Sequence, residues 1–186
     1  MRYLKGLENY QSNCPTAVTI GKFNGLHRGH ELLIGKTIEY SQAENLDSVV
    51  LVFELPPSIA SKQIISNEQR RSRLSDRVDY LIECPLDAQL LKMEAETFIE
   101  QILVDKLHAT RIVVGEDFHF GNQRKGDGNL LKASEKKYGF SVEVVKKICY
   151  QDREISSTFV REALETGQME LVNELLGYDY KELAES

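Results

Sequence analysis

Residues 17–30 read AVTIGKFNGLHRGH, an apolar run that passes through two glycines into a pair of histidines. Residues 17–20 have the uncharged character of a buried strand, and the chain enters a loop at Gly21. After His30, the apolar residues fall mostly on one side of a helix: Leu32, Leu33, Ile34 and Ile38. A strand, a glycine-containing loop and a helix in this order form the repeating unit of parallel α/β sheets.

The same alternation continues along the chain. Further strands are expected at 48–53, 79–84, 111–115 and 141–145, and helices at 94–107, 128–138, 156–165 and 168–176, with a capping box at 66–69 opening a shorter helix. This order predicts an α/β fold with a doubly wound, mostly parallel sheet and helices on both faces. Ligands of such sheets bind beyond the carboxyl ends of the strands, where the strand order reverses. We therefore expect the chemistry in the polar loops that begin near residues 21, 115 and 155.

Composition excludes several classes of protein. The 186 residues suit one domain with a real core, and we expect a single domain over residues 1–186. No apolar stretch approaches the roughly 20 residues that span a bilayer, and no secretory signal opens the chain, so we expect a cytoplasmic protein with no membrane partner. A net charge of −6 argues against nucleic-acid binding but permits a local pocket for an anionic small molecule. Three widely spaced cysteines favour neither a disulfide framework nor a zinc cage.

His27 and His30 are the first candidates for chemistry. Their spacing places them on one face of a helix at its start, and Gly29 between them allows another group to approach the backbone. A helix N-terminus also offers unpaired N–H groups and a partial positive charge, which suits charge building on phosphate oxygens. Zinc is the competing interpretation, but two histidines are too few ligands and no cysteine is near in sequence.

The run Ser156-Ser157-Thr158 forms the second candidate, with Arg161 following within the first turns of a helix. Serine and threonine are preferred N-caps, so a plain cap explains part of this pattern. Three successive hydroxyls and an arginine exceed what a cap needs, and an arginine binds anionic oxygens bidentately. The run is therefore also a candidate anion site.

Three motifs in order resemble the HxGH nucleotidylyltransferase superfamily and, more narrowly, the adenylyltransferase domain of bacterial FAD synthetases. The family's G-x-F-D-G-x-H-x-G-H is followed closely at 21–30, its V-G-x-(D/N)-F-x-F-G at 114–121 with a glycine–aspartate pair at 126–127, and its I-S-S-T-x-V-R at 155–161. The resemblance covers about residues 1–178. It implies a Rossmann-like nucleotidylyltransferase fold and the transfer of AMP from ATP to FMN, giving FAD and pyrophosphate.

Two positions depart from the family's pattern. Asn24 stands where the family usually has an aspartate, which removes a charge near the expected phosphates. The family's F-x-P-H-P lacks its histidine here, where residues 53–57 read FELPP. Both changes bear on metal or triphosphate handling or on the choice of acceptor. In bifunctional members this domain is fused to a riboflavin kinase, and we expect no kinase domain within residues 1–186.

The resemblance also implies residue roles. His27 and His30 would act on the α-phosphate, and Arg161 with the serines would hold the leaving pyrophosphate, so the expected catalytic residues are His27, His30 and Arg161. The remaining expected nucleotide-binding residues are Gly21, Phe23, Asn24, Gly25, Ser156, Ser157 and Thr158. Asp117, Phe53 and Pro57 are expected to contact the substrate, while Phe118 and Phe120 are expected in the core. Mg²⁺ would arrive bound to ATP, because it prefers phosphate oxygens and water to an all-protein cage, so no protein metal site is expected.

Two alternatives remain. The acceptor could be another phosphorylated cofactor precursor, such as phosphopantetheine. The chain could also be a binding module that senses a nucleotide or flavin without reacting, which would bind ATP or FMN and release no pyrophosphate. The two histidines and Arg161 favour catalysis, since binding alone needs less preorganised charge-stabilising apparatus.

Overall fold

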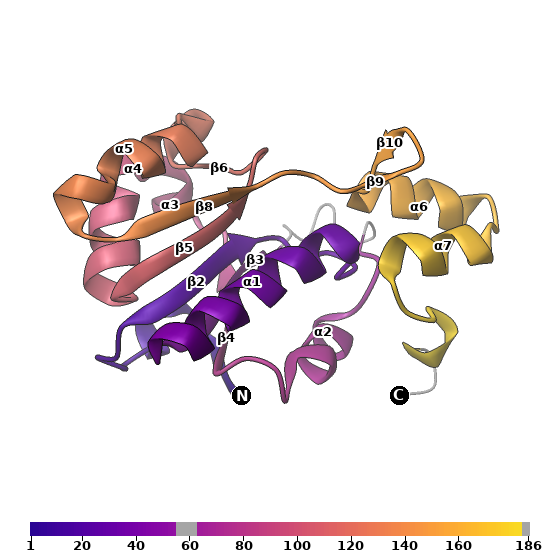
Figure 1. Cartoon of the computed structure of the whole chain (residues 1–186), viewed down its shortest axis with the longest axis horizontal. Coiled ribbons are helices and arrows are strands. Elements are labelled where there is room, and N and C mark those ends of the chain that lie inside the picture. The colour runs from indigo at the N-terminus through magenta and orange to yellow at the C-terminus, as the bar shows by residue number, and fades with distance from the viewer. Residues whose placement is uncertain (55–62, 184–186) are drawn as a thin grey trace.

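A six-stranded parallel sheet forms the centre of the protein (Figure 1). The computed structural model describes residues 1–54 and 63–183. The strands lie in the order β1-β4-β3-β2-β5-β8, and each neighbouring pair is parallel. Their bounds are β1 Arg2–Lys5, β2 Thr16–Gly21, β3 Asp47–Glu54, β4 Tyr80–Pro85, β5 Ala109–Gly115 and β8 Ser141–Val145.

Helices connect the strands and close the chain. They are α1 Arg28–Glu44, α2 Asn67–Leu74, α3 Ala88–Lys92, α4 Ala95–Thr97, a π-helix Phe98–Lys106, α5 Gly128–Tyr138, α6 Ser157–Glu165 and α7 Met169–Leu176, with 3₁₀ turns at Leu7–Asn9, Asn122–Arg124 and Lys181–Leu183. Two small antiparallel hairpins pair β6 (His119–Phe120) with β7 (Gly126–Asp127), and β9 (Cys149–Tyr150) with β10 (Arg153–Glu154). No helix among the described residues has both the length and the apolar character needed to cross a membrane.

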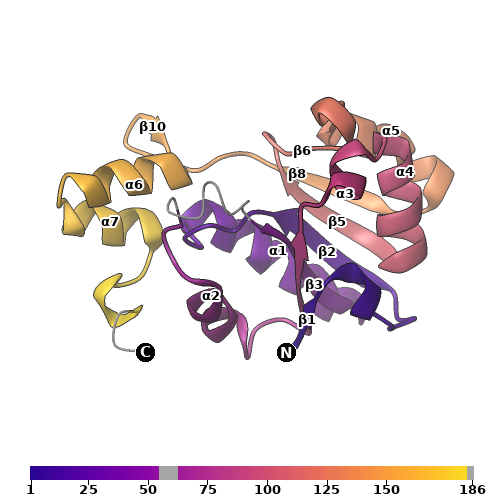
Figure 2. The same cartoon turned by 180° about the vertical axis from the view of Figure 1, so that it is seen from behind.

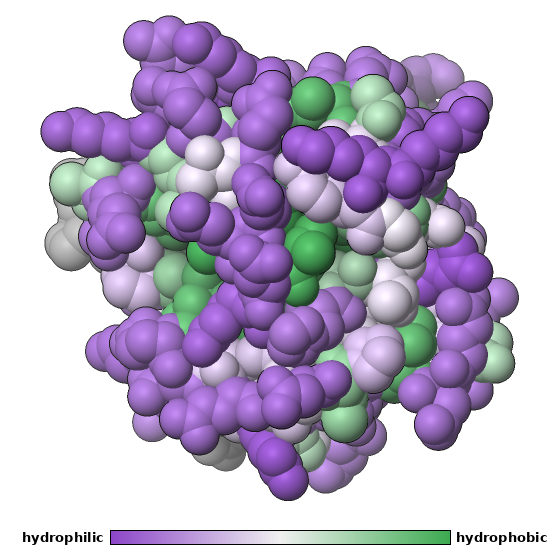
Figure 3. Space-filling view, turned by 90° about the vertical axis from the view of Figure 1, so that its left-hand side faces the viewer, coloured by the Kyte–Doolittle hydropathy of each residue, from purple (hydrophilic) through white to green (hydrophobic). Residues whose placement is uncertain are grey.

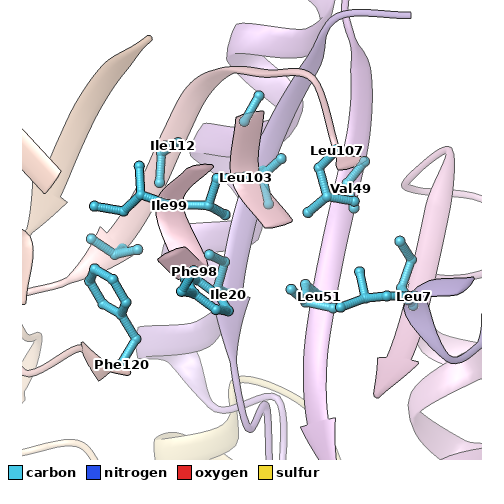
Figure 4. Close-up of a cluster of buried hydrophobic side chains, with 14 of the residues drawn as sticks. Leu7, Ile20, Val49, Leu51, Phe98, Ile99, Leu103, Leu107, Ile112 and Phe120 are labelled. Carbon is cyan, nitrogen blue, oxygen red and sulfur yellow. The ribbon is translucent and has the colours of Figure 1, made fainter. Parts of the chain in front are cut away.

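Each face of the sheet buries its own apolar core. Successive residues of a strand point to opposite faces, so Val49 and Leu51 of β3 join one core while Val50 and Val52 join the other. The first core lies under the π-helix and α5 (Figures 2 and 4). The second lies under α1 and extends to α6 and α7. Hydrophilic residues cover most of the face seen in Figure 3, with apolar residues between them.

The strand order reverses beside β2. The chain runs from β2 through β3 to β4 on one side, then returns to place β5 and β8 on the other side of β2. The carboxyl ends of β2 and β5 therefore flank the point of reversal, where ligands of doubly wound sheets bind. A long segment after β8 carries the chain beyond this edge to α6 and α7 (Figure 1).

The prediction of a doubly wound, mostly parallel sheet is confirmed. Each expected strand and each long helix is present within a few residues of its predicted bounds, including the capping box in which Ser66 and Gln69 bond each other's backbone N–H. The expected helix over 94–107 changes character after one turn: the Leu107 N–H donates to the Ile102 carbonyl, five residues back, as in a π-helix. The edge strand β1 and both hairpins were not predicted.

Candidate functional site

A cavity of about 350 Å³ lies at the carboxyl ends of β2 and β5, between the N-termini of α1 and α6. Most of its lining comes from the three loops in which we expected the chemistry, and part comes from the carboxyl ends of β3 and β8. The lining includes Gly21, Lys22, Phe23, His27, Gly29, His30, Phe53, Gly115, Asp117, Phe118, His119, Arg124, Lys146, Lys147, Ile155, Ser156 and Ser157. The paired histidines and the first two hydroxyl residues of α6 thus face one cavity.

The loop after β2 is compact because several of its residues adopt left-handed backbone conformations. Phe23, Gly25 and Leu26 have φ values of 46°, 91° and 41°. The Phe23 and Leu26 side chains are fully buried and anchor the loop in the second core. At Gly25 a Cβ atom would also lie 2.9 Å from the Ile64 side chain, so this position requires glycine.

His27 and His30 stack on each other with ring centroids 3.7 Å apart. His27 is the N-cap of α1 and is 7% exposed, and the His30 ring also contacts Phe23. Gly29 leaves room for this arrangement, because a Cβ there would lie 3.2 Å from the His27 ring. Neither Nδ1 atom has a hydrogen-bond partner among the described residues, although both are buried.

Burial keeps both imidazoles neutral. It lowers the pKa of His27 to about 4, partly opposed by the Asp117 carboxylate. Burial also lowers the pKa of His30 well below its ordinary value, and the charges of His27 and Arg70 act in the same direction. At neutral pH each ring therefore carries one N–H and can donate one hydrogen bond.

The hydroxyl residues of α6 are already engaged in the protein's own hydrogen bonds. Ser156 caps the helix by accepting from the Phe159 N–H at 3.2 Å. Ser157 donates to the Asn24 carbonyl at 2.8 Å, and Thr158 accepts from Arg161 at 3.0 Å. Ser156 and Ser157 line the cavity, whereas Thr158 and Arg161 are not among its lining residues.

Asn24 holds the loop in place and does not line the main cavity. Its side chain is 5% exposed, and its Oδ1 accepts from the Ile64 N–H at 2.8 Å. Gly25 is likewise buried away from the cavity, and its carbonyl accepts from the Tyr178 hydroxyl at 2.7 Å. Both residues were expected to bind the nucleotide, but in this structure they bond the segments packed around the loop.

Of the three residues expected to contact the substrate, Asp117 and Phe53 line the cavity, while Pro57 lies outside the described residues. Phe120 is in the first core as predicted, at 5% exposure. Phe118 is only half-buried and lines the cavity, so the prediction that it is simply a core residue is incomplete.

A set of basic side chains around the cavity was missed from the sequence: Lys22, His119, Arg124, Lys146 and Lys147. Lys147 bonds Glu154 at 2.7 Å and Asp117 at 3.3 Å. Lys146 and Lys147 directly follow β8, so the rule that ligands bind at the carboxyl ends of strands, applied to this strand as well, would have found them. They give an acidic protein a locally positive pocket.

Nothing within residues 1–54 and 63–183 resembles a protein metal centre: no three histidine, cysteine, aspartate or glutamate side chains converge there. In this part of the chain the two histidines stack on each other and have no such cluster around them. Two histidines by themselves are fewer than the three or four protein ligands of a zinc site.

Comparison with known proteins places the chain in a family. Residues 9–159 match the family model of FAD synthetase. The bifunctional riboflavin kinase/FMN adenylyltransferase of Haemophilus influenzae is 33% identical over 195 residues, covering 97% of this chain and 61% of the relative. The protein of the same name from Escherichia coli K12 is also 33% identical, covering 97% of this chain and 60% of the relative. The chain thus spans about three fifths of the length of these curated relatives.

The fold also has a solved counterpart. The crystal structure of a macrolide-efflux protein from Streptococcus pneumoniae superimposes with a TM-score of 0.83 at 24% identity, covering 96% of this chain and 62% of that chain. At this identity the likeness shows the shared fold alone. The family model covers most of the chain and carries the assignment, so the chain belongs to the FAD synthetase family.

Proposed function

We propose that this chain transfers the AMP part of ATP to FMN, producing FAD and pyrophosphate. The relatives named above are FMN adenylyltransferases as well as riboflavin kinases. The observation that carries the proposal is that His27, His30 and the N-terminus of α6 face one cavity at the reversal point of the sheet. We further propose that residues 1–186 act as one nucleotidylyltransferase domain, because loops of the six-stranded sheet and the N-terminus of α6 line one cavity. A cytoplasmic location is part of the same proposal.

Two helix N-termini would bind the triphosphate. The first N–H groups of α1 and of α6 have no partner within their own helices, and each helix adds a partial positive charge at this end. Such ends bind phosphate groups without further cationic residues. With the cavity between them, the triphosphate would be held from both sides.

The neutral histidines would stabilise the charge that develops during transfer. The FMN phosphate attacks the α-phosphorus of ATP in line, the bond to the β-phosphate oxygen breaks, and pyrophosphate leaves. His27 and His30 would donate hydrogen bonds to the α-phosphate oxygens as charge builds on them. No covalent enzyme intermediate is needed, because positioning and charge stabilisation account for most of the catalysis in phosphoryl-type transfers.

The hydroxyl run and Arg161 would hold the leaving pyrophosphate. Ser156 accepts a hydrogen bond from the helix but keeps its own hydroxyl proton, which it can donate to a phosphate oxygen. Ser157 uses its proton on Asn24, so its contribution would come from its backbone N–H at the start of α6. Arg161 stands one turn along α6 from Ser157, and a helical side chain leans toward the N-terminus, which would bring its guanidinium toward the phosphates.

Magnesium ion would enter with ATP and neutralise the charge on the triphosphate. Mg²⁺ prefers phosphate oxygens and water to an all-protein cage, so the proposal assigns it to the triphosphate. Asp117 contributes a carboxylate to the cavity wall, and Lys147 already pairs with it. Asp117 and Phe53 are proposed to contact FMN, with Lys22 and Lys147 adding positive charge.

The proposal is tested by incubating the purified chain with Mg-ATP and FMN and separating the products by chromatography. FAD and pyrophosphate should appear together. Riboflavin in place of FMN should give neither product, because riboflavin has no phosphate group that can attack the α-phosphorus of ATP. Product with phosphopantetheine but not FMN would instead identify another acceptor. Binding of both ligands without any product would show a binding module rather than an enzyme.

A further inference from the structure

A buried ion cluster lies at the same edge of the sheet, next to the candidate site. Glu83, near the end of β4, is fully buried, and the side chain of Arg70 on α2 is 4% exposed. Arg70 donates to Glu83 Oε1 through Nη2 at 2.6 Å and through Nε at 3.2 Å. Taking two charges out of water is costly, so a pair of this kind needs its remaining donors and acceptors satisfied.

The carboxylate of Glu83 is fully engaged. Its second oxygen, Oε2, accepts from Arg71 Nη2 at 3.1 Å and from the Tyr3 hydroxyl at 2.9 Å. Together with the two bonds from Arg70, each oxygen therefore accepts two hydrogen bonds. Glu83 therefore holds the cluster together, and its two oxygens have no acceptor capacity left for a ligand.

Arg70, in contrast, has donors to spare. Its Nη2 also donates to Asn67 Oδ1 at 2.9 Å, but its Nη1 has no hydrogen-bond partner within the described part of the chain. Nη1 is not one of the fully buried polar atoms that lack a partner, so it keeps some access to the surface of the hollow, where a ligand oxygen can take the place of water. The fixed Nε and Nη2 bonds also hold the guanidinium rigidly, so Nη1 is presented in one orientation.

Arg70 lines a small hollow that adjoins the main cavity. The hollow has a volume of about 10 Å³, which is room for roughly one oxygen atom. Its other lining residues are Lys22, Asn24, Phe53, Glu54 and Gln63, and Lys22 and Phe53 line the main cavity as well. The positive charge of Arg70 also helps to lower the pKa of His30, after burial and His27.

We propose that Arg70 recognises the acceptor's ring: its Nη1 donates a hydrogen bond to a carbonyl oxygen of the flavin that reaches the hollow past Lys22 and Phe53. This inference rests on the proposed function. A carbonyl suits the hollow better than a phosphate, because the space admits one oxygen and the Glu54 carboxylate repels a dianion. The acceptor phosphate must also be at the histidines for transfer to occur, which leaves the ring to extend toward Phe53.

The test compares Arg70→Lys with Arg71→Lys. Arg71 is the next residue, bonds the same carboxylate and stacks on Tyr3, but does not line the hollow. Both variants keep a positive charge for Glu83, whereas Arg70→Lys removes the Nη1 edge. Dissociation constants for FMN and riboflavin are measured by quenching of flavin fluorescence, and the Kd of Mg-ATP by calorimetry. The double variant Arg70→Gln/Glu83→Gln, which removes both buried charges and leaves only the partly exposed Arg71 without its carboxylate, repeats the test should Arg70→Lys fold poorly.

We expect Arg70→Lys to weaken FMN and riboflavin binding roughly ten- to a hundredfold, the scale of one charge-assisted hydrogen bond, without changing ATP binding. Arg71→Lys should leave all three within about twofold, since no ligand contact is lost. Unchanged flavin binding in Arg70→Lys, an equal loss in Arg71→Lys, an equal loss for ATP, or a loss for FMN but not riboflavin would each overturn the assignment.

These outcomes are separable from those of the proposed function. If the wild-type chain makes FAD and Arg70→Lys binds flavin normally, only the role of Arg70 is wrong. If the wild-type chain makes no FAD but Arg70→Lys loses flavin affinity, only the catalytic proposal is wrong. A wild-type chain that neither makes FAD nor binds flavin contradicts both.

Discussion

At the scale of single residues, the stacked imidazoles of His27 and His30 link stability to pH. The pKa of His27 is lowered from 6.5 to about 4 in the folded protein, so below pH 6.5 the unfolded chain binds the proton more tightly. The contribution of neutral His27 to the free energy of unfolding is therefore fully present above about pH 6.5. It is lost as the pH falls toward 4, and the loss reaches about 3 kcal/mol once His27 is protonated in both the folded and the unfolded state. His30 adds a loss of the same sign.

Chemical denaturation at pH 7, 5.5 and 4 measures this loss, and His27→Gln should reduce it, because glutamine does not titrate. A His27→Gln variant with the same pH dependence as the wild type would show that His27 is not held neutral by the fold.

His30 and Arg161 are both expected to act on turnover. Replacing either by alanine should lower kcat roughly 10²-fold or more, the scale of removing one charge-stabilising donor. The melting temperature should change little in Arg161→Ala, whereas His30→Ala also loses the ring contacts with His27 and Phe23 and should melt at a lower temperature. Arg153→Ala is the matched control for Arg161, because Arg153 bonds Glu162 on the same helix but lines a separate surface hollow. Steady-state kinetics and thermal melts check this, and near-normal turnover in His30→Ala or Arg161→Ala would refute the proposed role.

The residues that the sequence could predict are those with a motif around them. His27, His30, Ser156 and Ser157 were singled out by spacing and type, and the fold brings them to one cavity. The basic residues that line the cavity do not form a sequence motif, so they were not predicted. The role of Arg70 could not be predicted for a further reason. It depends on a buried ion pair with Glu83, 13 residues away, and the periodicity of a single sequence does not indicate such pairs.

At the scale of elements, the cap of α6 is expected to serve both folding and binding. Ser156→Ala should cost about 1 kcal/mol of stability through the lost bond to the Phe159 N–H. It should also raise the KM for ATP, because a hydroxyl donor of a cavity-lining residue is lost. Ser66→Ala removes the cap of α2, which does not line the cavity, and should reproduce the stability loss alone.

Urea unfolding and substrate-dependent kinetics on the two serine variants check this pair of expectations. Equal KM values for ATP in Ser156→Ala and Ser66→Ala would show that Ser156 only caps α6 and does not bind ATP.

Element types followed from hydrophobic period, and the exceptions have physical causes. The helix over 94–107 was expected from its apolar side, but apolar periodicity does not distinguish bonds five residues apart from bonds four apart, so the π-helix was not foreseen. The edge strand β1 has only four residues, two of them exposed, so it lacks the apolar run of a central strand. Each strand of the two hairpins has only two residues, which is too few to show the alternation of apolar and polar residues that predicts a strand.

At the scale of the whole molecule, the C-terminal segment braces the loops around the site. The Tyr178 hydroxyl donates to the Gly25 carbonyl at 2.7 Å, and the Tyr180 hydroxyl donates to the Ile64 carbonyl at 2.9 Å. These bonds link residues more than a hundred positions apart in sequence. Motif spacing relates residues that are close in sequence, so it could not predict bonds between positions this far apart. The central sheet, in contrast, could be predicted from the order of its strands and helices.

Tyr178→Phe/Tyr180→Phe should therefore lose about 1 kcal/mol of stability for each hydrogen bond. It should also lower kcat/KM, because the loop after β2 is less firmly positioned relative to α6. Thermal melts and kinetics below the melting transition separate the two effects. A double variant that is destabilised yet fully active at low temperature would show that this bracing serves the fold alone.

The central claim, adenylyl transfer in this cavity, is tested most directly by following the α-phosphate of ATP. The chain is incubated with Mg²⁺, FMN and ATP labelled at the α-phosphate, alongside the His27→Gln/His30→Gln variant. We predict that the label enters FAD while unlabelled pyrophosphate is released, and that the variant binds both substrates but transfers the label at least roughly 10²-fold more slowly. Label that stays in ATP or appears only in AMP, or a variant as fast as the wild type, would contradict the account.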